Sequence, residues 1–273
     1  MVDSEILAYY EHGFEQDRLA GGRQRIEFLR LWDLLERHLP PPPAQVLDVG
    51  GGAGVYAVPL AAAGYHVHLI DPVPLHVDQA TAAARAAEVQ LAGAAVGDAR
   101  ALDAADGSVD VALLLGPLYH LTSKTDRIAA LREARRVVRP GGLIIAKALS
   151  RFYPVFEDLT DGMGSEPGEF AGTARFLADG QYRNPSDDPA KFTTSYFHRP
   201  EELTGEIREA DLDLRVLVGA SGPVKLLAGI AQRLEDPAQR EYLLSVLRVL
   251  ESEPSIIGMS QNLVAVAQVP SKA

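Results

Sequence analysis

Residues 46–54 read Val46-Leu47-Asp48-Val49-Gly50-Gly51-Gly52-Ala53-Gly54, a short apolar run that passes directly into a cluster of glycines. The run predicts a buried strand at 45–49, and the glycines predict a sharp turn where the backbone can approach a ligand closely. A helix predicted at 55–63 follows, so the free N–H groups of its first turn face the same ligand. This stretch therefore indicates a nucleotide-type site between a first strand and its helix.

Strands and helices alternate after this turn. Further strands are expected at 66–70, 94–97, 109–115 and 143–148, with helices at 75–87 and 125–138. A later helix and two strands are expected at 201–210, 213–218 and 262–268. This alternation predicts a Rossmann-like, doubly wound α/β fold, in which a mostly parallel sheet of about seven strands has helices on both faces.

The 273 residues are expected to form four regions. They are an N-terminal helical arm or cap at 1–44, a cofactor-binding core at 45–149, a lid insertion at 150–199, and the rest of the sheet at 200–273 with a helical insertion at about 222–257. Four consecutive prolines at 40–43 end the arm, because proline cannot continue a helix. Half of the aromatic side chains lie between 152 and 197, which predicts a folded lid rather than a linker.

Composition narrows the class of protein. Lys and Arg number 26 against 37 Asp and Glu, and the net charge of −11 disfavours a nucleic-acid partner. The absence of cysteine excludes disulfide scaffolds, zinc ribbons and thiol nucleophiles. The longest apolar run, 111–119, is about half as long as a membrane span, and the acidic start is unlike a secretory signal. We therefore expect a cytoplasmic protein with neither a membrane nor a nucleic acid as its partner.

Aspartates mark the ends of three predicted strands. Asp71 ends the second strand, where a carboxylate can accept hydrogen bonds from a ribose diol, and Asp98 follows the third. Residues 52–57 also satisfy the pattern G-x-G-x-x-A, so a dinucleotide site is formally allowed, although such a match is weak alone. Asp48 lies just before the glycines, where it would attract a cationic or amino-bearing ligand and repel a pyrophosphate. An NAD(P)-dependent oxidoreductase therefore stays as an alternative.

The motifs together resemble those of a known family. The segments 46–54, Ile70-Asp71, Gly97-Asp98-Ala99, 109–115 and Arg139-Pro140-Gly141-Gly142 resemble, in order and spacing, the class I S-adenosylmethionine-dependent methyltransferases, above all bacterial small-molecule members. The resemblance covers 45–148 strongly and is looser in the arm and at 196–203. It implies an enzyme that uses S-adenosylmethionine, leaves S-adenosylhomocysteine, and methylates an O or N nucleophile, less readily C, of a small molecule.

The resemblance also implies cofactor-binding positions along the core. Asp48 and the backbone of Gly50 and Gly52 would hold the methionine part of the cofactor. The remaining positions would hold the ribose (Asp71), pack on the adenine (Pro72), read the adenine edge (Asp98, Ala99) and line the donor site near the reactive carbon (Leu115, Gly116).

In the arm, Tyr10 and Arg25 are expected to close over the cofactor. Arg25 would do so by pairing with the methionine carboxylate, since guanidinium groups bind carboxylates through strong charge-assisted hydrogen bonds. Arg18, Arg23 and Arg30 are nearby alternatives, and both Tyr10 and Arg25 also fit plain structural roles.

Methyl transfer from a sulfonium is an in-line displacement, so the protein mainly has to align donor and acceptor and exclude water. A base is needed only where the acceptor must lose a proton. His120, just after the fourth strand, is the first candidate for a base or substrate contact, with Tyr119 second and His198 entering from the far side. A structural role stays open for each. No histidine pair has a metal-ligand spacing, so we expect no metal.

Other assignments stay open. A methyltransferase acting on a peptide or RNA is disfavoured by the acidic balance and the aromatic lid, and a non-catalytic module of the same fold by the three intact aspartates. The chain is expected to be a monomer or a homodimer. Its sequence does not identify the methyl acceptor, because one fold and motif set serves many substrates.

Overall fold

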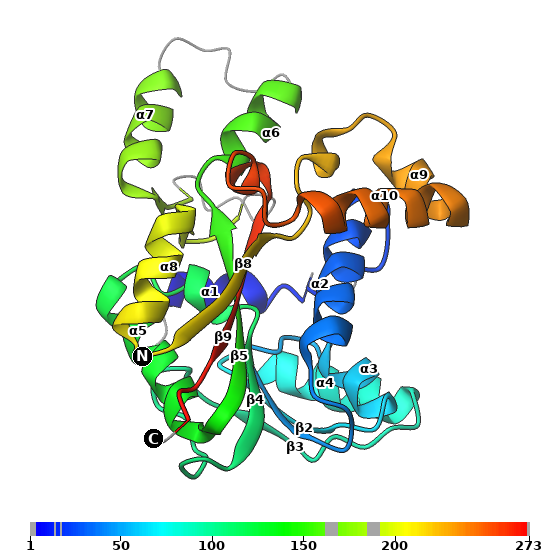
Figure 1. Cartoon of the computed structure of the whole chain (residues 1–273), viewed down its shortest axis with the longest axis vertical. Coiled ribbons are helices and arrows are strands. Elements are labelled where there is room, and N and C mark those ends of the chain that lie inside the picture. The colour runs from blue at the N-terminus through cyan, green and yellow to red at the C-terminus, as the bar shows by residue number, and fades with distance from the viewer. Residues whose placement is uncertain (1–3, 14, 17, 162–168, 185–191, 272–273) are drawn as a thin grey trace.

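The computed structural model describes residues 4–13, 15–16, 18–161, 169–184 and 192–271. Within them, nine strands form one sheet in the order β3-β2-β1-β4-β5-β7-β6, with β9 beside β5 and β8 beside β9 (Figure 1). The strands are β1 (Gln45–Val49), β2 (His66–Asp71), β3 (Gly93–Val96), β4 (Val109–Leu114), β5 (Val138–Ser150), β6 (Gln181–Tyr182), β7 (Ser195–His198), β8 (Asp213–Gly219) and β9 (Asn262–Gln268). The predicted doubly wound α/β fold is confirmed, with two strands more than expected.

The sheet is parallel over its first five strands and antiparallel at one side. β1 pairs in parallel with both β2 and β4, and β3 and β5 extend the same arrangement outward. β9 runs antiparallel along β5, and β8 runs antiparallel along β9. The carboxyl ends of β1 to β4 therefore meet at one edge of the sheet, which is where such folds bind ligands.

Helices cover both faces of this sheet (Figure 1). They are α1 (Ser4–Tyr10), α2 (Arg25–His38), α3 (Ala57–Ala62), α4 (Pro74–Ala86), α5 (Lys124–Val137), α6 (Tyr153–Asp161), α7 (Glu169–Asp179), α8 (Pro200–Glu209), α9 (Ile230–Glu235) and α10 (Pro237–Leu250). Successive side chains of a strand point to opposite faces. Accordingly, Ala112 and Leu114 of β4 pack in the core under α5 and α8, whereas Val111 and Leu113 pack in the core under α2, α3 and α4.

β5 begins earlier than the sequence suggests. We expected a strand at 143–148 after a break at Pro140-Gly141-Gly142, but α5 ends at Val137 and β5 starts at the next residue. A register shift between β4 and β5 near Val109 accommodates the proline, which lacks an N–H for the sheet. β5 is thus a long central strand that runs from α5 to the base of the lid.

The predicted lid segment contributes two strands of its own. Phe197 of β7 pairs with Leu149 at the end of β5, beyond the last pairing of β5 with β4, and β6 pairs with β7. α6 and α7 stand beyond this end of β5 (Figure 1). The lid is therefore attached to the sheet through backbone hydrogen bonds, which the loss of strand–helix alternation in the sequence did not reveal.

The N-terminal arm consists of two helices that lie in different places. α2 packs on the sheet through Leu31, Leu34 and Leu35, and ends at His38 before the prolines. α1 ends at Tyr10 and lies at the cavity described below. The boundaries of the four predicted regions stay predictions. Among the described helices, none combines the length and apolar character needed to cross a membrane.

Candidate active site

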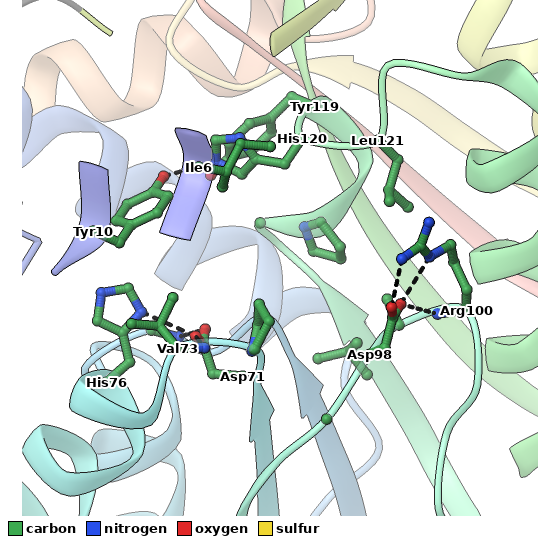
Figure 2. Close-up of a pocket in the computed structure, with 18 of the residues that line it drawn as sticks. Ile6, Tyr10, Asp71, Val73, His76, Asp98, Arg100, Tyr119, His120 and Leu121 are labelled. Carbon is green, nitrogen blue, oxygen red and sulfur yellow. Dashed lines mark hydrogen bonds and ion pairs between the residues drawn. The ribbon is translucent and has the colours of Figure 1, made fainter. Parts of the chain in front are cut away.

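A cavity of about 290 Å³, here called the strand-end cavity, lies at the carboxyl ends of β1 to β4. Its floor consists of residues that directly end or follow these strands: Val49, Gly50, Asp71, Pro72, Gly97, Asp98, Ala99 and Gly116. Ile6 and Tyr10 of α1 lie across it from the strands (Figure 2). The strand-end cavity therefore combines a floor of backbone and short side chains with a cover from the N-terminal arm.

The glycine turn brings two loops into close contact. Gly50 has φ +69°, and its N–H donates to the carbonyl of Ile70 at 2.7 Å. A Cβ on Gly116, at the end of β4, would lie 2.8 Å from the carbonyl oxygen of Gly50. Both positions therefore need glycine, the first for its backbone conformation and the second for space.

Asp71 is fixed from three sides. Its Oδ2 accepts from the N–H of Gly52 at 2.8 Å, and its Oδ1 accepts from the N–H of Val73 at 2.9 Å. His76 Nδ1 lies 3.0 Å from Oδ1 as well. These contacts hold the carboxylate at the wall of the strand-end cavity, where its remaining lone pairs can accept hydrogen bonds from a ligand diol.

Asp98 is held by an arginine that the sequence analysis did not single out. Oδ1 accepts from the N–H and Nε of Arg100 at 2.9 and 3.0 Å, and Oδ2 accepts from Nη2 at 2.6 Å (Figure 2). Hydrogen bonding to Arg100 lowers the pKa of Asp98. Arg100 also pairs with Asp126 at 2.9 Å. Asp98 is therefore ionised and oriented, and a ligand amine would share it with Arg100.

A second, small cavity of about 40 Å³ lies on the other side of the glycines and is here called the glycine-loop cavity. Asp48 lines it and is fully buried. Neither carboxylate oxygen of Asp48 has a hydrogen-bond partner in the described part of the chain. Burial, reinforced by the charge of Asp71, raises the pKa of Asp48 to about 7. Buried polar atoms normally have partners, so this carboxylate calls for a ligand with a donor or a positive charge.

A third cavity of about 580 Å³, here called the lid cavity, lies under α6 and α7. Its walls include aromatic residues of the arm and the lid, namely Tyr9, Tyr10, Tyr153, Phe176, Tyr182, Phe192 and Phe197. Charged side chains at its inner end include Arg18, Glu27 and Lys147. Tyr119 and Glu15 line all three cavities. The three spaces therefore meet around Tyr119, in the turn after β4.

The three predicted catalytic residues differ in position. Tyr119 borders all three cavities, and burial raises its pKa. His120 lines the strand-end cavity, but its Nε2 lies 2.7 Å from Tyr10 Oη and its Nδ1 lies 3.4 Å from the carbonyl of Thr194. A carbonyl accepts only, so Nδ1 donates and Nε2 accepts from Tyr10. Burial lowers the pKa of His120 to about 4. A weakly basic nitrogen that already accepts a hydrogen bond is poorly suited to remove a proton.

His198 lies away from these cavities. It is fully buried on β7, with Nε2 3.1 Å from Glu206 of α8, and it lines none of the three. Glu206 also pairs with Arg127 at 2.7 Å, and that guanidinium stacks on Tyr196. This cluster joins α5, α8 and β7, and gives His198 a structural position rather than access to an acceptor.

The predicted cofactor positions lie together with one exception. Tyr10, Gly50, Gly52, Asp71, Pro72, Asp98, Ala99 and Gly116 line the strand-end cavity, and Asp48 and Leu115 line the glycine-loop cavity. Arg25 lines neither, and its guanidinium lies 3.2 Å from Glu235 of α9. Arg18, named only as an alternative, lines the glycine-loop cavity beside Asp48. Arg25 faces the opposite side of the arm because α2 turns that position toward α9.

Lys147, like Arg100, is a site residue that the sequence did not point to. It lies on β5 and is 3% exposed, and it lines both the glycine-loop and the lid cavity. A lysine inside an otherwise apolar predicted strand is the signal that could have revealed it, because lysine is almost never fully buried unless paired. Among the described residues, no three acidic or histidine side chains are grouped as metal ligands would be, and the expectation of no metal stays a prediction.

Comparison with known proteins agrees with the geometry. Residues 46–142 match the family model described as a methyltransferase domain. Over 178 residues the chain is 31% identical to a ubiquinone biosynthesis O-methyltransferase of Methylobacterium nodulans, covering 64% of this chain and 62% of that protein. Over 111 residues it is 38% identical to a malonyl-[acyl-carrier protein] O-methyltransferase of Methylococcus capsulatus, covering 39% and 38%. The chain thus spans less than two thirds of the length of these curated relatives.

The fold has a counterpart among solved structures. A SAM-dependent methyltransferase from Methanosarcina mazei superimposes with a TM-score of 0.60 at 18% identity, over 88% of this chain and 98% of that one. Residues 46–142 thus match the methyltransferase-domain family, and the fold around them is shared with a SAM-dependent methyltransferase. The predicted enzyme class and the cofactor, S-adenosylmethionine, are confirmed at the level of this family.

Proposed function

We propose that this protein transfers the methyl group of S-adenosylmethionine to a small molecule, with the cofactor across the strand-end and glycine-loop cavities and the acceptor in the lid cavity. The curated relatives are named as O-methyltransferases, which favours oxygen over nitrogen as the acceptor atom. A cavity under two lid helices also suits a small acceptor better than a peptide or RNA, which would need an open groove.

The observation that carries this proposal is the unpartnered carboxylate of Asp48. The carboxylate lies fully buried beside the glycine turn. No group among the described residues donates a hydrogen bond to it. S-adenosylmethionine brings an ammonium and a sulfonium group, either of which would supply the missing positive charge. A dinucleotide would instead bring a pyrophosphate next to a carboxylate, which disfavours the NAD(P)-dependent alternative.

When bound, the cofactor supplies an electrophilic methyl group on a sulfonium sulfur. Asp71 would accept hydrogen bonds from the ribose hydroxyls, while the N–H of Ala99 and Asp98 would face the adenine. Arg18 would pair with the methionine carboxylate from the glycine-loop side. Together these groups would hold the methyl donor in the cavities that Gly116 and Tyr119 line.

The lid cavity would hold the acceptor and exclude water. Its aromatic walls supply apolar contact, and a site enclosed in this way strengthens the electrostatic interactions inside it. Tyr119 lines the cavities proposed for the methyl donor and the one proposed for the acceptor, so its ring and hydroxyl would position the reacting atom. His120 would not serve as a base. It would instead hold α1 in place by accepting the hydrogen bond from Tyr10.

Calorimetry with S-adenosylhomocysteine and with NAD⁺ tests the cofactor assignment. We expect the former alone to bind, and to bind more weakly to D48N, while the matched variant D78N on the exposed face of α4 behaves as wild type. Binding of NAD⁺ in preference would overturn the proposal. A screen of small acceptors that follows release of S-adenosylhomocysteine then identifies the substrate.

A further inference from the structure

One buried cation lies between the cavities proposed for the methyl donor and for the methyl acceptor. The side chain of Lys147 on β5 is 4% exposed and lines both the glycine-loop and the lid cavity. Its Nζ lies 2.8 Å from Glu27 Oε1 on α2 and 5.4 Å from the centre of the Tyr119 ring. The ammonium group therefore adjoins Tyr119, which borders all three cavities.

Lys147 has hydrogen-bonding capacity that the protein leaves free. An ammonium group carries three donors, and within the described residues Glu27 is the acceptor for Nζ. Burying a cation on a central strand is costly, and leaving its donors unsatisfied adds to that cost. A ligand oxygen in the adjoining cavities explains a buried lysine with N–H groups left over better than packing does.

Glu27 is shared between Lys147 and two other cations. Arg18 Nη1 lies 3.2 Å and Lys225 Nζ lies 3.9 Å from the same carboxylate. Arg18 also pairs with Glu15 at 2.9 Å. Burial favours the neutral amine, but the charges of Glu27 and Tyr119 and the hydrogen bond to Glu27 together outweigh burial and raise the pKa of Lys147, which stays cationic at neutral pH. Three cations around two carboxylates, Glu27 and Glu15, leave a net positive charge for an anion.

Among the described residues, the other carboxylates that line these cavities are not paired with Lys147. Glu157 of α6 pairs with Arg23 at 3.2 Å, and that arginine is 41% exposed. Asp158 lines the lid cavity but not the glycine-loop cavity. Asp48 faces the glycine turn, where the cationic donor would lie. The potential of Lys147 is therefore directed at whatever enters the inner end of the lid cavity.

We propose that Lys147 binds the reacting oxygen of the acceptor as an anion, which makes the substrate a small molecule with an acidic O–H group, either a phenol or enol or a carboxylic acid. This inference rests on the proposed function. It also accounts for the unsuitability of His120 as a base, because an acceptor bound as its anion needs none.

In the reaction, the acceptor O–H loses its proton to solvent before transfer. The oxygen then forms a bond to the methyl carbon while the carbon–sulfur bond breaks, and that electron pair stays on sulfur. An anion and a sulfonium become a neutral ether or ester and a neutral thioether. Because the anionic charge disappears in this step, Lys147 would favour ionisation and binding of the acceptor rather than accelerate the transfer itself.

The probe for this role is 4-nitrophenol, whose anion absorbs at longer wavelength than its neutral form and which titrates near neutrality. It is added to the protein saturated with S-adenosylhomocysteine, and its absorbance is followed against pH. We expect the wild type to lower the pKa of the bound probe by at least about one unit, equivalent to a tenfold preference for the anion. K147M should lose this shift and bind the probe about tenfold more weakly, while K147R should keep most of it.

Controls separate this inference from folding and from the proposed function. In K147M, Glu27 keeps Arg18 and Lys225 as partners, so the variant should fold and bind S-adenosylhomocysteine normally. R23M removes a different cation from the same cavity and should leave the probe's pKa shift intact. If S-adenosylhomocysteine does not bind at all, the proposed function fails first.

With S-adenosylhomocysteine bound, three results would overturn the role of Lys147 alone: an unchanged shift in K147M, binding of the neutral phenol by the wild type, or no effect of millimolar protein on the probe. Competition then distinguishes the two acid classes. Stronger displacement of the probe by benzoate than by catechol would support a carboxylic acid as the substrate, and the reverse would support a phenol.

Discussion

The strand-end cavity and the lid cavity adjoin at Tyr119 but are built differently. The strand-end cavity takes its floor from residues within three positions of a strand end, such as Gly50, Asp71 and Asp98, and much of that surface is backbone. The lid cavity takes its walls from side chains of α1, α2, β5, α6 and α7. One site is set by the sheet, and the other by how separate helices pack over it.

This difference matches the demands of the two ligands. A cofactor common to a whole family can be held by a fixed geometry at the sheet edge, where a hydrogen bond to Asp71 also holds the Gly52 turn. An acceptor that varies among family members needs walls that can change without disturbing the sheet. Substitutions in the first cavity should therefore alter cofactor binding steeply, and those in its cover or in the lid more gently.

Asp71 offers the largest expected effect. D71A removes a carboxyl acceptor for the ribose hydroxyls and also the partner of the Gly52 and Val73 N–H groups. Hydrogen bonds to charged groups contribute about 1.5–3 kcal/mol each, so we expect affinity for S-adenosylhomocysteine to fall by about 100-fold. Calorimetry measures this loss, with D78A on the exposed side of α4 as the matched control. Unchanged affinity in D71A would contradict the ribose assignment.

Two arginines of the arm provide the next contrast. R18M should lower cofactor affinity by about tenfold, because it removes a charge-assisted hydrogen bond in the glycine-loop cavity. R25M should leave affinity unchanged and shift stability by less than about 1 kcal/mol, since its pair with Glu235 is solvent-exposed. Calorimetry and thermal unfolding test both variants. A larger loss of affinity in R25M than in R18M would restore the original sequence prediction.

The strand-end cavity could be predicted from sequence because its determinants are local. A strand, a glycine turn and an aspartate occur within a few residues of one another, and parallel topology brings all strand ends to one edge. The sequence alone therefore predicts the positions of Asp71 and Asp98 at this edge, and of Asp48 just before the glycine turn. Arg100 was missed because its pairing with Asp98 follows from a turn conformation that composition does not specify.

The lid cavity could not be predicted in the same way. Tyr10, Arg18, Lys147 and Phe192 are far apart in the chain, and only the packing of α1, α2 and the lid on β5 brings them together. Aromatic content identified the lid segment, but not which rings face the cavity. That the glycine-loop cavity is lined by Arg18 and not by Arg25 could not be predicted for the same reason, because which side of the arm faces the sheet depends on packing with α9.

Asp48 links cofactor binding to pH, with an effect smaller than that of Arg18. Its pKa of about 7 means that near neutral pH it is partly protonated. A cationic ligand binds the anion, so binding must release that proton, and affinity for S-adenosylmethionine should rise with pH from 6 to 8 before levelling off. Because one proton is released, the affinity cannot rise by more than about tenfold per pH unit. Titrations in buffers of different ionisation enthalpy detect the proton released.

D48N provides the control for this pH dependence, and its affinity should be flat across the same range. It should also remove a second effect. Burial raises the pKa of Asp48 from 3.8 to about 7 on folding, so the folded state holds a proton that the unfolded state releases. The free energy of unfolding of the cofactor-free protein should therefore fall as pH rises from 4 to 7, by a few kcal/mol at most. A buffer-independent binding enthalpy in the wild type would contradict this account.

Tyr10 and Tyr9 allow the gentlest test, because these neighbouring residues of α1 differ in their access to the strand-end cavity. Tyr10 lines both the strand-end and the lid cavity and donates to His120 Nε2 at 2.7 Å, whereas Tyr9 lines the lid cavity but not the strand-end cavity, and contacts Phe192 edge-on. A neutral hydrogen bond contributes about 0.5–1.5 kcal/mol, so Y10F should speed dissociation of S-adenosylhomocysteine by about three- to tenfold. Y9F should leave that rate unchanged and weaken acceptor binding instead. Stopped-flow displacement measures the rate, and an equal effect of both substitutions would show that α1 covers the two cavities as one surface rather than as two.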